Sequence, residues 1–206
     1  MVEQFIEDTE LSKLGFSPQQ QELIVELEKT QQDFWNVARS SANFLNMLIK
    51  ISGAKTVVEV GTSNGYSGIW IGKALKKELG GTGGKLTTIE YYEKRIALAR
   101  ENFEKCEVSD IITTKQGSAT QVLEELCSRE GFEIDLAFID ANKGEYVKYF
   151  DIINTKLKKG GIIAADNITS HPEKVATFVD KIKADENYQV EILDLPAGML
   201  IGYKIR

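Results

Sequence analysis

Apolar residues along the chain follow two different spacings, and the spacing changes near residue 50. Before that point they recur at the interval of an amphipathic helix, which predicts a helical N-terminal segment over residues 1–50. After the break at Ser52-Gly53-Ala54, short runs of β-branched residues alternate with helical patterns. The first such run predicts a strand over 56–60, followed by a glycine-containing turn and a helix over 65–78.

The alternation of strand and helix continues to the end of the chain. Further strands are predicted at 85–90, 111–115, 135–140 and 161–166, with helices at 93–105, 120–129 and 144–157. Two last strands follow at 188–193 and 199–205, and one of them can run antiparallel. We therefore predict an α/β fold with a doubly wound, mostly parallel seven-stranded sheet and helices on both faces. No linker divides the chain, so we expect a single domain over 1–206 with its core at 55–206.

The composition narrows the choice of partners. The chain has 206 residues, of which 42% are hydrophobic and 27% charged, as in an ordinary globular domain. Its net charge of −6 repels a phosphate backbone at long range, which disfavours nucleic acid unless basic side chains gather locally. A small-molecule partner is therefore favoured.

The cysteines and the first residues point to a reducing compartment. The opening MVEQFIEDTELSK lacks the apolar core of a secretion signal, and Cys106 and Cys127 form no disulfide framework. No apolar run approaches the roughly 20 residues that span a bilayer. We expect a cytoplasmic protein with free thiols that does not enter a membrane.

A glycine turn after the first predicted strand is a candidate ligand site. In open α/β sheets, ligands bind beyond the carboxyl ends of the strands. Gly61 and Gly65 have the spacing G-x-x-x-G, which differs from the dinucleotide and P-loop patterns. Glu90 ends the next strand, where a carboxylate can accept hydrogen bonds from ribose hydroxyls. The pattern favours an adenosine-type ligand without phosphates. The same residues are also compatible with a tight strand-to-helix connection that binds nothing and a Glu90 side chain that is merely solvated.

Acidic residues end two later strands. Asp140 follows one, and Asp166-Asn167 follows the next, so parallel pairing would bring two carboxylates and an amide oxygen together. Hard oxygen ligands select Mg²⁺, Ca²⁺ or Mn²⁺ over zinc, although Asp and Asn at these positions also serve as helix caps and turns. A cation here would favour the neutral amine of nearby Lys143, which could then act as a base.

Taken in order, these residues resemble the metal-dependent O-methyltransferases related to catechol and caffeoyl-coenzyme A O-methyltransferases. The resemblance runs from about residue 42 to the C-terminus. It is carried by these segments: Glu59-Val60-Gly61-Thr62-Ser63-Asn64-Gly65-Tyr66-Ser67, Glu90, Gly117-Ser118-Ala119, Phe138-Ile139-Asp140-Ala141-Asn142-Lys143-Gly144-Glu145-Tyr146, Gly160-Gly161 and Asp166-Asn167.

The resemblance implies a role for each of these residues. The residues expected to bind S-adenosylmethionine are Glu59, Gly61, Thr62, Ser63, Gly65, Ser67, Glu90, Ser118, Ala119 and Asp140, with Glu90 at the ribose and Ser118-Ala119 at the adenine. Asp140, Asp166 and Asn167 would hold the divalent metal, and Lys143 would be the general base, with Asp140 beside it. The implied reaction is methyl transfer to a small catechol-like phenol.

The chain departs from the family pattern on the acceptor side. Ala42-Asn43 stands where glycine-glutamine is common, Ile168–His171 lacks the usual tryptophan or polar group, and Pro196–Met199 replaces a Gly-Asp-Gly sequence. Methylation of a hydroxylated nucleoside in transfer RNA therefore remains an alternative. A non-catalytic cofactor-binding protein is a second alternative, and a nicotinamide-dependent oxidoreductase is disfavoured by the glycine spacing. The N-terminal helices would cover the sheet or acceptor pocket, or bury a homodimer interface.

Overall fold

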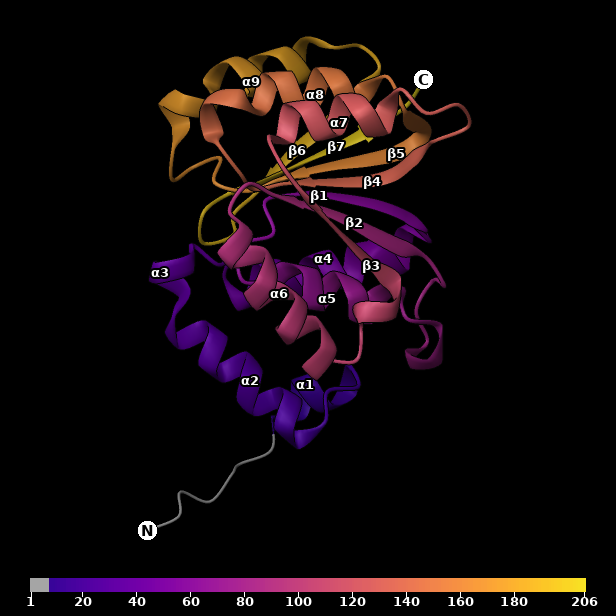
Figure 1. Cartoon of the computed structure of the whole chain (residues 1–206). Helices are drawn as coiled ribbons and strands as arrows, with labels where there is room; N and C mark the ends of the chain where they lie inside the picture. The colour runs from indigo at the N-terminus through magenta and orange to yellow at the C-terminus, as the bar shows by residue number, and fades with distance from the viewer. Residues whose placement is uncertain (1–7) are drawn as a thin grey trace.

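The computed structural model describes residues 8–206, so the first seven residues of the predicted helical segment 1–50 lie outside the described part. A seven-stranded sheet runs through the middle of the molecule (Figure 1) in the order β3-β2-β1-β4-β5-β7-β6. Strands β1 to β5 pair in parallel, and β7 is antiparallel to both of its neighbours. The strands are β1 (Thr56–Val60), β2 (Lys85–Glu90), β3 (Ile112–Gln116), β4 (Ile134–Ile139), β5 (Leu157–Ala165), β6 (Tyr188–Leu193) and β7 (Met199–Lys204).

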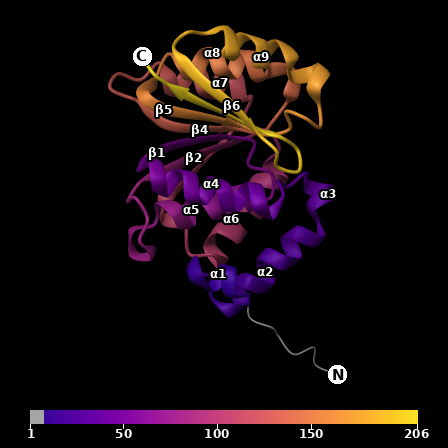
Figure 2. The same ribbon diagram turned by 180° about the vertical axis from the view of Figure 1, so that it is seen from behind.

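Helices cover both faces of this sheet (Figures 1 and 2). One face carries α4 (Arg39–Ser52), α5 (Tyr66–Leu75) and α6 (Glu93–Lys105), and the other carries α7 (Ala119–Cys127), α8 (Tyr146–Asn154) and α9 (Pro172–Ala184). The N-terminal helices α1 (Thr9–Lys13), α2 (Pro18–Lys29) and α3 (Gln31–Phe34) lie outside the first of these layers. The predicted doubly wound fold is therefore confirmed.

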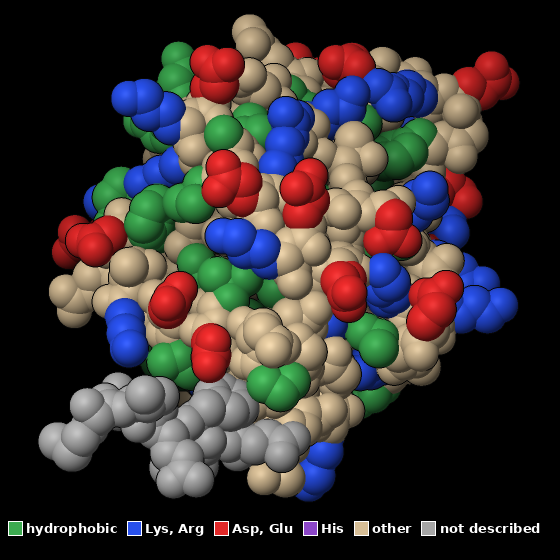
Figure 3. Space-filling model, turned by 60° about the horizontal axis from the view of Figure 1, so that its bottom comes forward, with side chains coloured by type: hydrophobic (Ala, Val, Ile, Leu, Met, Phe, Trp, Pro, Cys, Tyr) green, Lys and Arg blue, Asp and Glu red, His purple; other side chains and the backbone are tan. Residues whose placement is uncertain are grey.

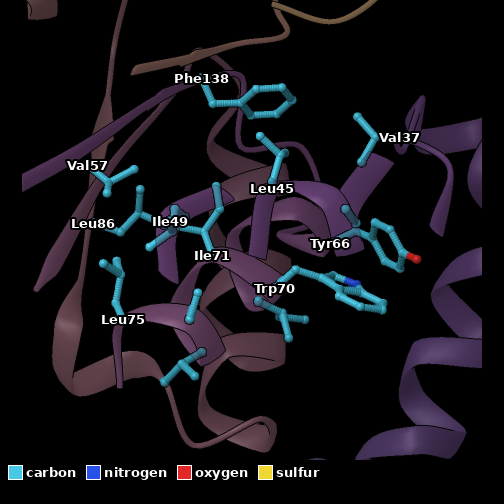
Figure 4. Packing of buried hydrophobic residues seen from close by; sticks show 14 of the residues in the cluster. Val37, Leu45, Ile49, Val57, Tyr66, Trp70, Ile71, Leu75, Leu86 and Phe138 are labelled. Atoms are coloured by element: carbon cyan, nitrogen blue, oxygen red, sulfur yellow. The ribbon is translucent and has the colours of Figure 1, made fainter. Parts of the chain in front are cut away.

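The central strands are buried on both faces because neighbouring side chains point to opposite sides of a sheet. In β4, Phe138 joins the cluster under α4 and α5, whereas Ile139 joins the cluster under α8 and α9. Val57 and Val58 divide in the same way in β1. Figure 4 shows Phe138 next to Leu45 of α4 in the first cluster. This double burial explains the continuous apolar runs in the sequence.

The order of the strands places the carboxyl ends of β1, β2, β4 and β5 along one edge. The strand order reverses between the parallel neighbours β1 and β4, which is the switch point where ligands bind in such sheets. Main-chain hydrogen bonds continue past the strand ends: Asp140 N–H donates to Val60 O at 2.9 Å, and Asp166 N–H donates to Ile139 O at 3.1 Å. The residues that follow the strands are thus held in register.

Several predicted boundaries agree with the structure, one predicted helix is too long, one predicted strand begins too late, and one helix was not predicted. The strands at 56–60, 85–90 and 188–193 and the helix at 93–105 have the predicted bounds. The predicted helix 144–157 is too long, since α8 ends at Asn154 and β5 begins at Leu157. The predicted strand 161–166 begins four residues too late, because Gly160 and Gly161 lie inside β5, in an irregular part where its register with β4 shifts. Helix α9 was not predicted.

The Phe138 side chain is fully buried, so its removal tests the first core cluster. We expect Phe138→Ala to lower the free energy of unfolding by about 3–5 kcal/mol, because the lost apolar contacts leave a cavity. Urea unfolding monitored by circular dichroism measures the change. Tyr203→Ala, at a side chain that is 46% exposed, is the control and should change the free energy by less than about 1 kcal/mol.

Candidate functional site

The glycine turn after β1 passes against the end of β4. Gly61 has a φ of +110°, and a Cβ added there would lie 2.1 Å from the main-chain oxygen of Asp140. Gly65 has a φ of +87°, and a Cβ added there would lie 2.8 Å from the ring of Phe103. Both positions therefore require glycine. The turn brings the backbone of Gly61 against Asp140, the first residue of what we call the acidic edge, formed by Asp140, Asp166 and Asn167 after β4 and β5.

Glu59 lies beneath this turn and is fully buried. Its carboxylate accepts hydrogen bonds from the hydroxyls of Ser67 and Thr88, each at 2.6 Å. Thr88 also contacts the hydroxyl of Thr62 at 2.6 Å, so the turn is tied to β2. Burial raises the pKa of Glu59 to about 7, although the two hydroxyls oppose the rise. These hydrogen bonds stabilise the turn through the side chains of Glu59, Thr62 and Ser67. The predicted contact of these residues with a cofactor stays a prediction.

Glu90 ends β2 and joins three backbone segments. One carboxylate oxygen accepts from Ser63 N–H at 2.9 Å, and the other accepts from the N–H groups of Tyr91 and Tyr92 at 2.8 and 3.0 Å. Gly117 N–H donates to the main-chain oxygen of Glu90 at 3.0 Å, which brings the following residues Ser118 and Ala119 to the same edge. The structure thus gathers the residues predicted for ribose and adenine around the end of β2.

The second part of the site lies at the ends of β4 and β5. Lys143 Nζ is 3.1 Å from Asp140 Oδ1. Asp166 is 2% exposed, and its Oδ2 accepts from the Asn167 side-chain amide at 3.1 Å. The other oxygen, Asp166 Oδ1, is buried and has no hydrogen-bond partner. Asp140, Lys143, Asp166 and Asn167 are therefore brought together as predicted from their positions after adjacent strands.

Burial and mutual repulsion disfavour ionisation of the two aspartates. Burial raises the pKa of Asp166 to about 7, and the charge of Asp140 adds to the rise. Burial also raises the pKa of Asp140, while the Lys143 ammonium opposes this rise. A buried carboxylate oxygen without a partner costs free energy, and a divalent cation would remove both the repulsion and the missing contact.

The donor set at this edge suits a hard cation only if an amide oxygen contributes. Within residues 8–206, His, Cys, Asp and Glu side chains form no group of three or more that could hold a metal. Asp140 and Asp166 supply two carboxylates, and Asn167 Oδ1 would be the third protein oxygen. Asn167 has a φ of 65°, a left-handed conformation that asparagine tolerates better than most residues.

The acceptor-side segments that depart from the family pattern lie together. Ile168 N–H donates to Gly198 O at 3.0 Å, and Thr169 N–H donates to Ala197 O at 2.9 Å. His171, which is exposed, is the N-cap residue just before α9, and its N–H donates to Asn167 O at 3.2 Å. The segments Ile168–His171 and Pro196–Met199 therefore lie side by side, directly after Asn167 in the case of the first.

Three contacts at the site were not predicted from the sequence. Tyr146, which is fully buried, donates its hydroxyl to Asp166 O at 3.2 Å. The Ser63 hydroxyl donates to Phe34 O at 2.6 Å, and Arg95 stacks on Trp35. The motif that contains Tyr146 could have indicated the first contact. The other two join segments that are far apart in sequence.

Two hollows lie away from these residues. One, of about 210 Å³, is lined by side chains of α6 and β3 that include Arg100 and Thr114. The other, of about 380 Å³, lies near Phe132 and Lys156. Neither touches the strand ends, and the chemistry at the strand ends identifies the better candidate site.

The fold is that of a class I methyltransferase, and comparison with known proteins gives the family. Residues 15–205 match a family described as O-methyltransferase, and the chain belongs to this family. It is 33% identical over 133 residues to the catechol O-methyltransferase of Niastella koreensis, covering 65% of this chain and 58% of that protein. It is 35% identical over 156 residues to the tapetum-specific methyltransferase 1 of Arabidopsis thaliana, covering 73% and 65%.

The coverage of the relatives differs. The matches to these two proteins span less than two thirds of their length. The match to caffeoyl-CoA O-methyltransferase 1 of Zea mays is 33% identical over 205 residues and covers 88% of this chain and 77% of that protein.

Solved structures share the fold across most of the chain. The O-methyltransferase from Bacillus cereus in complex with S-adenosylhomocysteine superposes with a TM-score of 0.80 at 23% identity, covering 97% of this chain and 92% of that one. The Podospora anserina methyltransferase PaMTH1, also bound to S-adenosylhomocysteine, gives 0.75 at 25% identity, covering 88% and 87%. Both have the same sheet architecture as this chain.

The close approach at Gly61 predicts a large effect of one added methyl group. Gly61→Ala should lower the free energy of unfolding by roughly 3–5 kcal/mol, because the new Cβ overlaps Asp140 O and adopts an unfavourable φ. Gly80→Ala is the matched control, since Gly80 has a φ of +74° with no atom within 4 Å of the added Cβ. The control should cost only about 1–2 kcal/mol. Equal losses in chemical denaturation would contradict the close approach.

Glu59 should make stability depend on pH. Its folded-state pKa of about 7 lies above the ordinary value of 4.5. Its contribution to stability is therefore full below pH 4.5 and is lost as the pH rises through about 7. The loss is on the order of 3 kcal/mol. Urea titrations at pH 5 and pH 8 should show a smaller decrease for Glu59→Gln than for the wild type, and an unchanged decrease would contradict the assignment.

Proposed function

We propose that this chain is an S-adenosylmethionine-dependent O-methyltransferase that requires a divalent cation and acts on a small catechol-like phenol. One observation carries the proposal: the glycine turn lies directly against Asp140, beside the unpartnered buried oxygen of Asp166. A cofactor on the turn and a cation at the acidic edge would then be neighbours. Methyl transfer needs the acceptor oxygen held close to the methyl group and in line with it, and neighbouring sites for cofactor and cation would allow this.

Cofactor binding is supported by the family and by the end of β2. Glu90 already orders the N–H groups of Ser63, Tyr91 and Tyr92, so the ribose of S-adenosylmethionine would meet a fixed carboxylate. The turn from Gly61 to Gly65 has no pattern for phosphates, which agrees with this cofactor. Ser118 and Ala119 would border the adenine.

The residues at the acidic edge fit a divalent cation. Asp140, Asp166 and Asn167 would hold it, and their hard oxygens favour Mg²⁺, with Ca²⁺ or Mn²⁺ as substitutes. When bound, the cation would lower the pKa of a phenol hydroxyl, which is about 10 in the free state of tyrosine. The unpartnered Asp166 Oδ1 is the observation on this chain that supports the fit.

Lys143 and Asp140 would handle the proton. Lys143 Nζ lies within hydrogen-bond distance of Asp140 Oδ1, so Asp140 orients the amine toward the edge where the acceptor would bind. In its neutral form, Lys143 would accept the phenol proton at Nζ, and the ammonium would then pair with Asp140. The remaining task of the chain is to hold the acceptor oxygen in line with the methyl group.

A small acceptor is favoured over RNA. The net charge is −6, and on the face that Figure 3 shows, acidic and basic side chains are interspersed. Nucleic-acid binding depends on clustered basic residues. We also propose a homodimer, for which the exposed apolar side chains Met47 and Ile51 on α4 are candidate contacts.

Lys143→Ala tests the proposed base. Purified protein is given S-adenosylmethionine and caffeic acid with Mg²⁺, and then with excess chelator. We expect turnover that needs the metal and falls about 100-fold or more in Lys143→Ala, because general bases contribute about this much. Lys148→Ala is the matched control, since Lys148 is exposed and pairs with Glu145 instead. It should retain wild-type turnover.

Other outcomes would redirect or reject the proposal. Binding of S-adenosylhomocysteine without turnover on any diol would favour the transfer-RNA alternative. Turnover that survives the chelator would reject the cation. Failure of the wild type to bind S-adenosylhomocysteine would reject the whole proposal.

A further inference from the structure

Three large aromatic side chains are exposed beside the end of β2. Trp35 is 70% exposed, Tyr91 66% and Tyr92 58%. The Arg95 guanidinium lies 4.7 Å from the ring centre of Trp35 and 5.5 Å from that of Tyr92, and the Tyr91 and Tyr92 rings meet edge to face at 5.3 Å. These four residues form a continuous stack, which we call the aromatic stack.

The aromatic stack is fixed to the predicted cofactor site through Ser63. The Ser63 N–H donates to the Glu90 carboxylate, and its hydroxyl donates to Phe34 O at 2.6 Å. Ser63 of the glycine turn therefore contacts both Glu90, which is predicted to bind the ribose, and Phe34, the residue before Trp35. Figures 1 and 2 both show α3 on the side where the strands end, next to the first turn of α6.

The backbone around Trp35 is held in a strained shape. Trp35 has a φ of 56°, which costs a non-glycine residue free energy and persists only where surrounding contacts impose it. Asn36 contributes such contacts, since its N–H and its side-chain amide donate to Gln31 O and Leu27 O, each at 3.0 Å. Strain of this kind is commonly found at ligand-binding segments.

The segment before α3 is anchored to the body of the molecule. The Tyr66 hydroxyl donates to Glu28 Oε1 at 2.7 Å, and Arg39 donates to both carboxylate oxygens of Glu28, each at 2.8 Å. Figure 4 shows the Tyr66 hydroxyl at the outer edge of the core cluster. Helix α2 is thus held at its C-terminal half, and α3 and Trp35 are presented from a fixed base.

We propose that Trp35 and Arg95 form a clamp that closes over the adenosine part of the bound cofactor and slows its release. Trp35 comes from the segment after α3 and Arg95 from α6, so their stacking joins these two elements. The last residue of α3 is also joined to Glu90 through Ser63. The indole face would cover the ribose side of the ligand, and the Tyr92 ring makes a second contact with Arg95. This inference rests on the proposed cofactor, but not on the acceptor or the cation.

Exposed cation–π contacts are weak, so the clamp can open for exchange. Loss of either partner should speed release of S-adenosylhomocysteine by about 3- to 30-fold, the range expected for one such contact plus the covered surface. Arg95→Ala can be followed by stopped-flow fluorescence, because the chain has two tryptophans and Trp70 is fully buried. The emission change on binding therefore reports on Trp35.

Arg100→Ala is the matched control for Arg95→Ala. Arg100 lies on the same helix and donates to the Thr114 hydroxyl instead of stacking on a ring. We expect it to release S-adenosylhomocysteine at the wild-type rate. Trp35→Ala should raise the dissociation constant measured by calorimetry by a similar factor, whereas Trp35→Phe, which keeps an aromatic face, should restore most of the affinity.

The possible results separate the clamp from the proposed function. Wild-type release rates and affinities in both Arg95→Ala and Trp35→Ala would overturn the clamp and leave the cofactor assignment standing. Unchanged cofactor binding with a raised KM for the phenol alone would also overturn it, because the stack would then face the acceptor. No binding of S-adenosylhomocysteine by the wild type would reject the proposed function and the clamp with it.

Discussion

The contact between Gly61 and the backbone of Asp140 is the constraint on which the site depends. A Cβ at residue 61 would lie 2.1 Å from Asp140 O, and the Asp140 N–H donates to Val60 O. Because of this contact, the turn after β1 and the loop after β4 cannot move apart independently. The predicted cofactor residues and the predicted cation residues are consequently two sides of one rigid junction at the switch point of the sheet.

Three buried carboxylates lie around this junction, and each has a different environment. Glu59 receives two hydroxyl hydrogen bonds, and Asp140 pairs with Lys143. Asp166 receives one bond from Asn167 and keeps one oxygen without a partner. Burial raises the pKa of all three. Glu59 therefore stabilises the turn through its hydrogen bonds. Asp166, which has an oxygen without a partner, is the carboxylate that a bound cation would stabilise most.

Local patterns in the sequence predicted much of this arrangement, and contacts between distant segments account for what they missed. Asp140 and Asp166 were expected to meet because consecutive parallel strands with one helix between them tend to be neighbours. Helix α9 was missed although Pro172 at its start and Val175, Phe178 and Ile182 on its buried face have helical spacing. The pairing of Glu59 with Ser67 depends on side-chain directions, and the stack of Trp35 on Arg95 depends on how α3 docks. Neither follows from residue spacing.

The central claim is that the edge formed by Asp140, Asp166 and Asn167 holds a divalent cation next to the cofactor. Anomalous X-ray diffraction from crystals of the full chain grown with Mn²⁺ and S-adenosylhomocysteine tests it directly. The account predicts one strong manganese peak within about 2.5 Å of oxygens from all three side chains, which is ordinary for a cation with oxygen ligands. Clear density for S-adenosylhomocysteine with no manganese peak at this edge would contradict it.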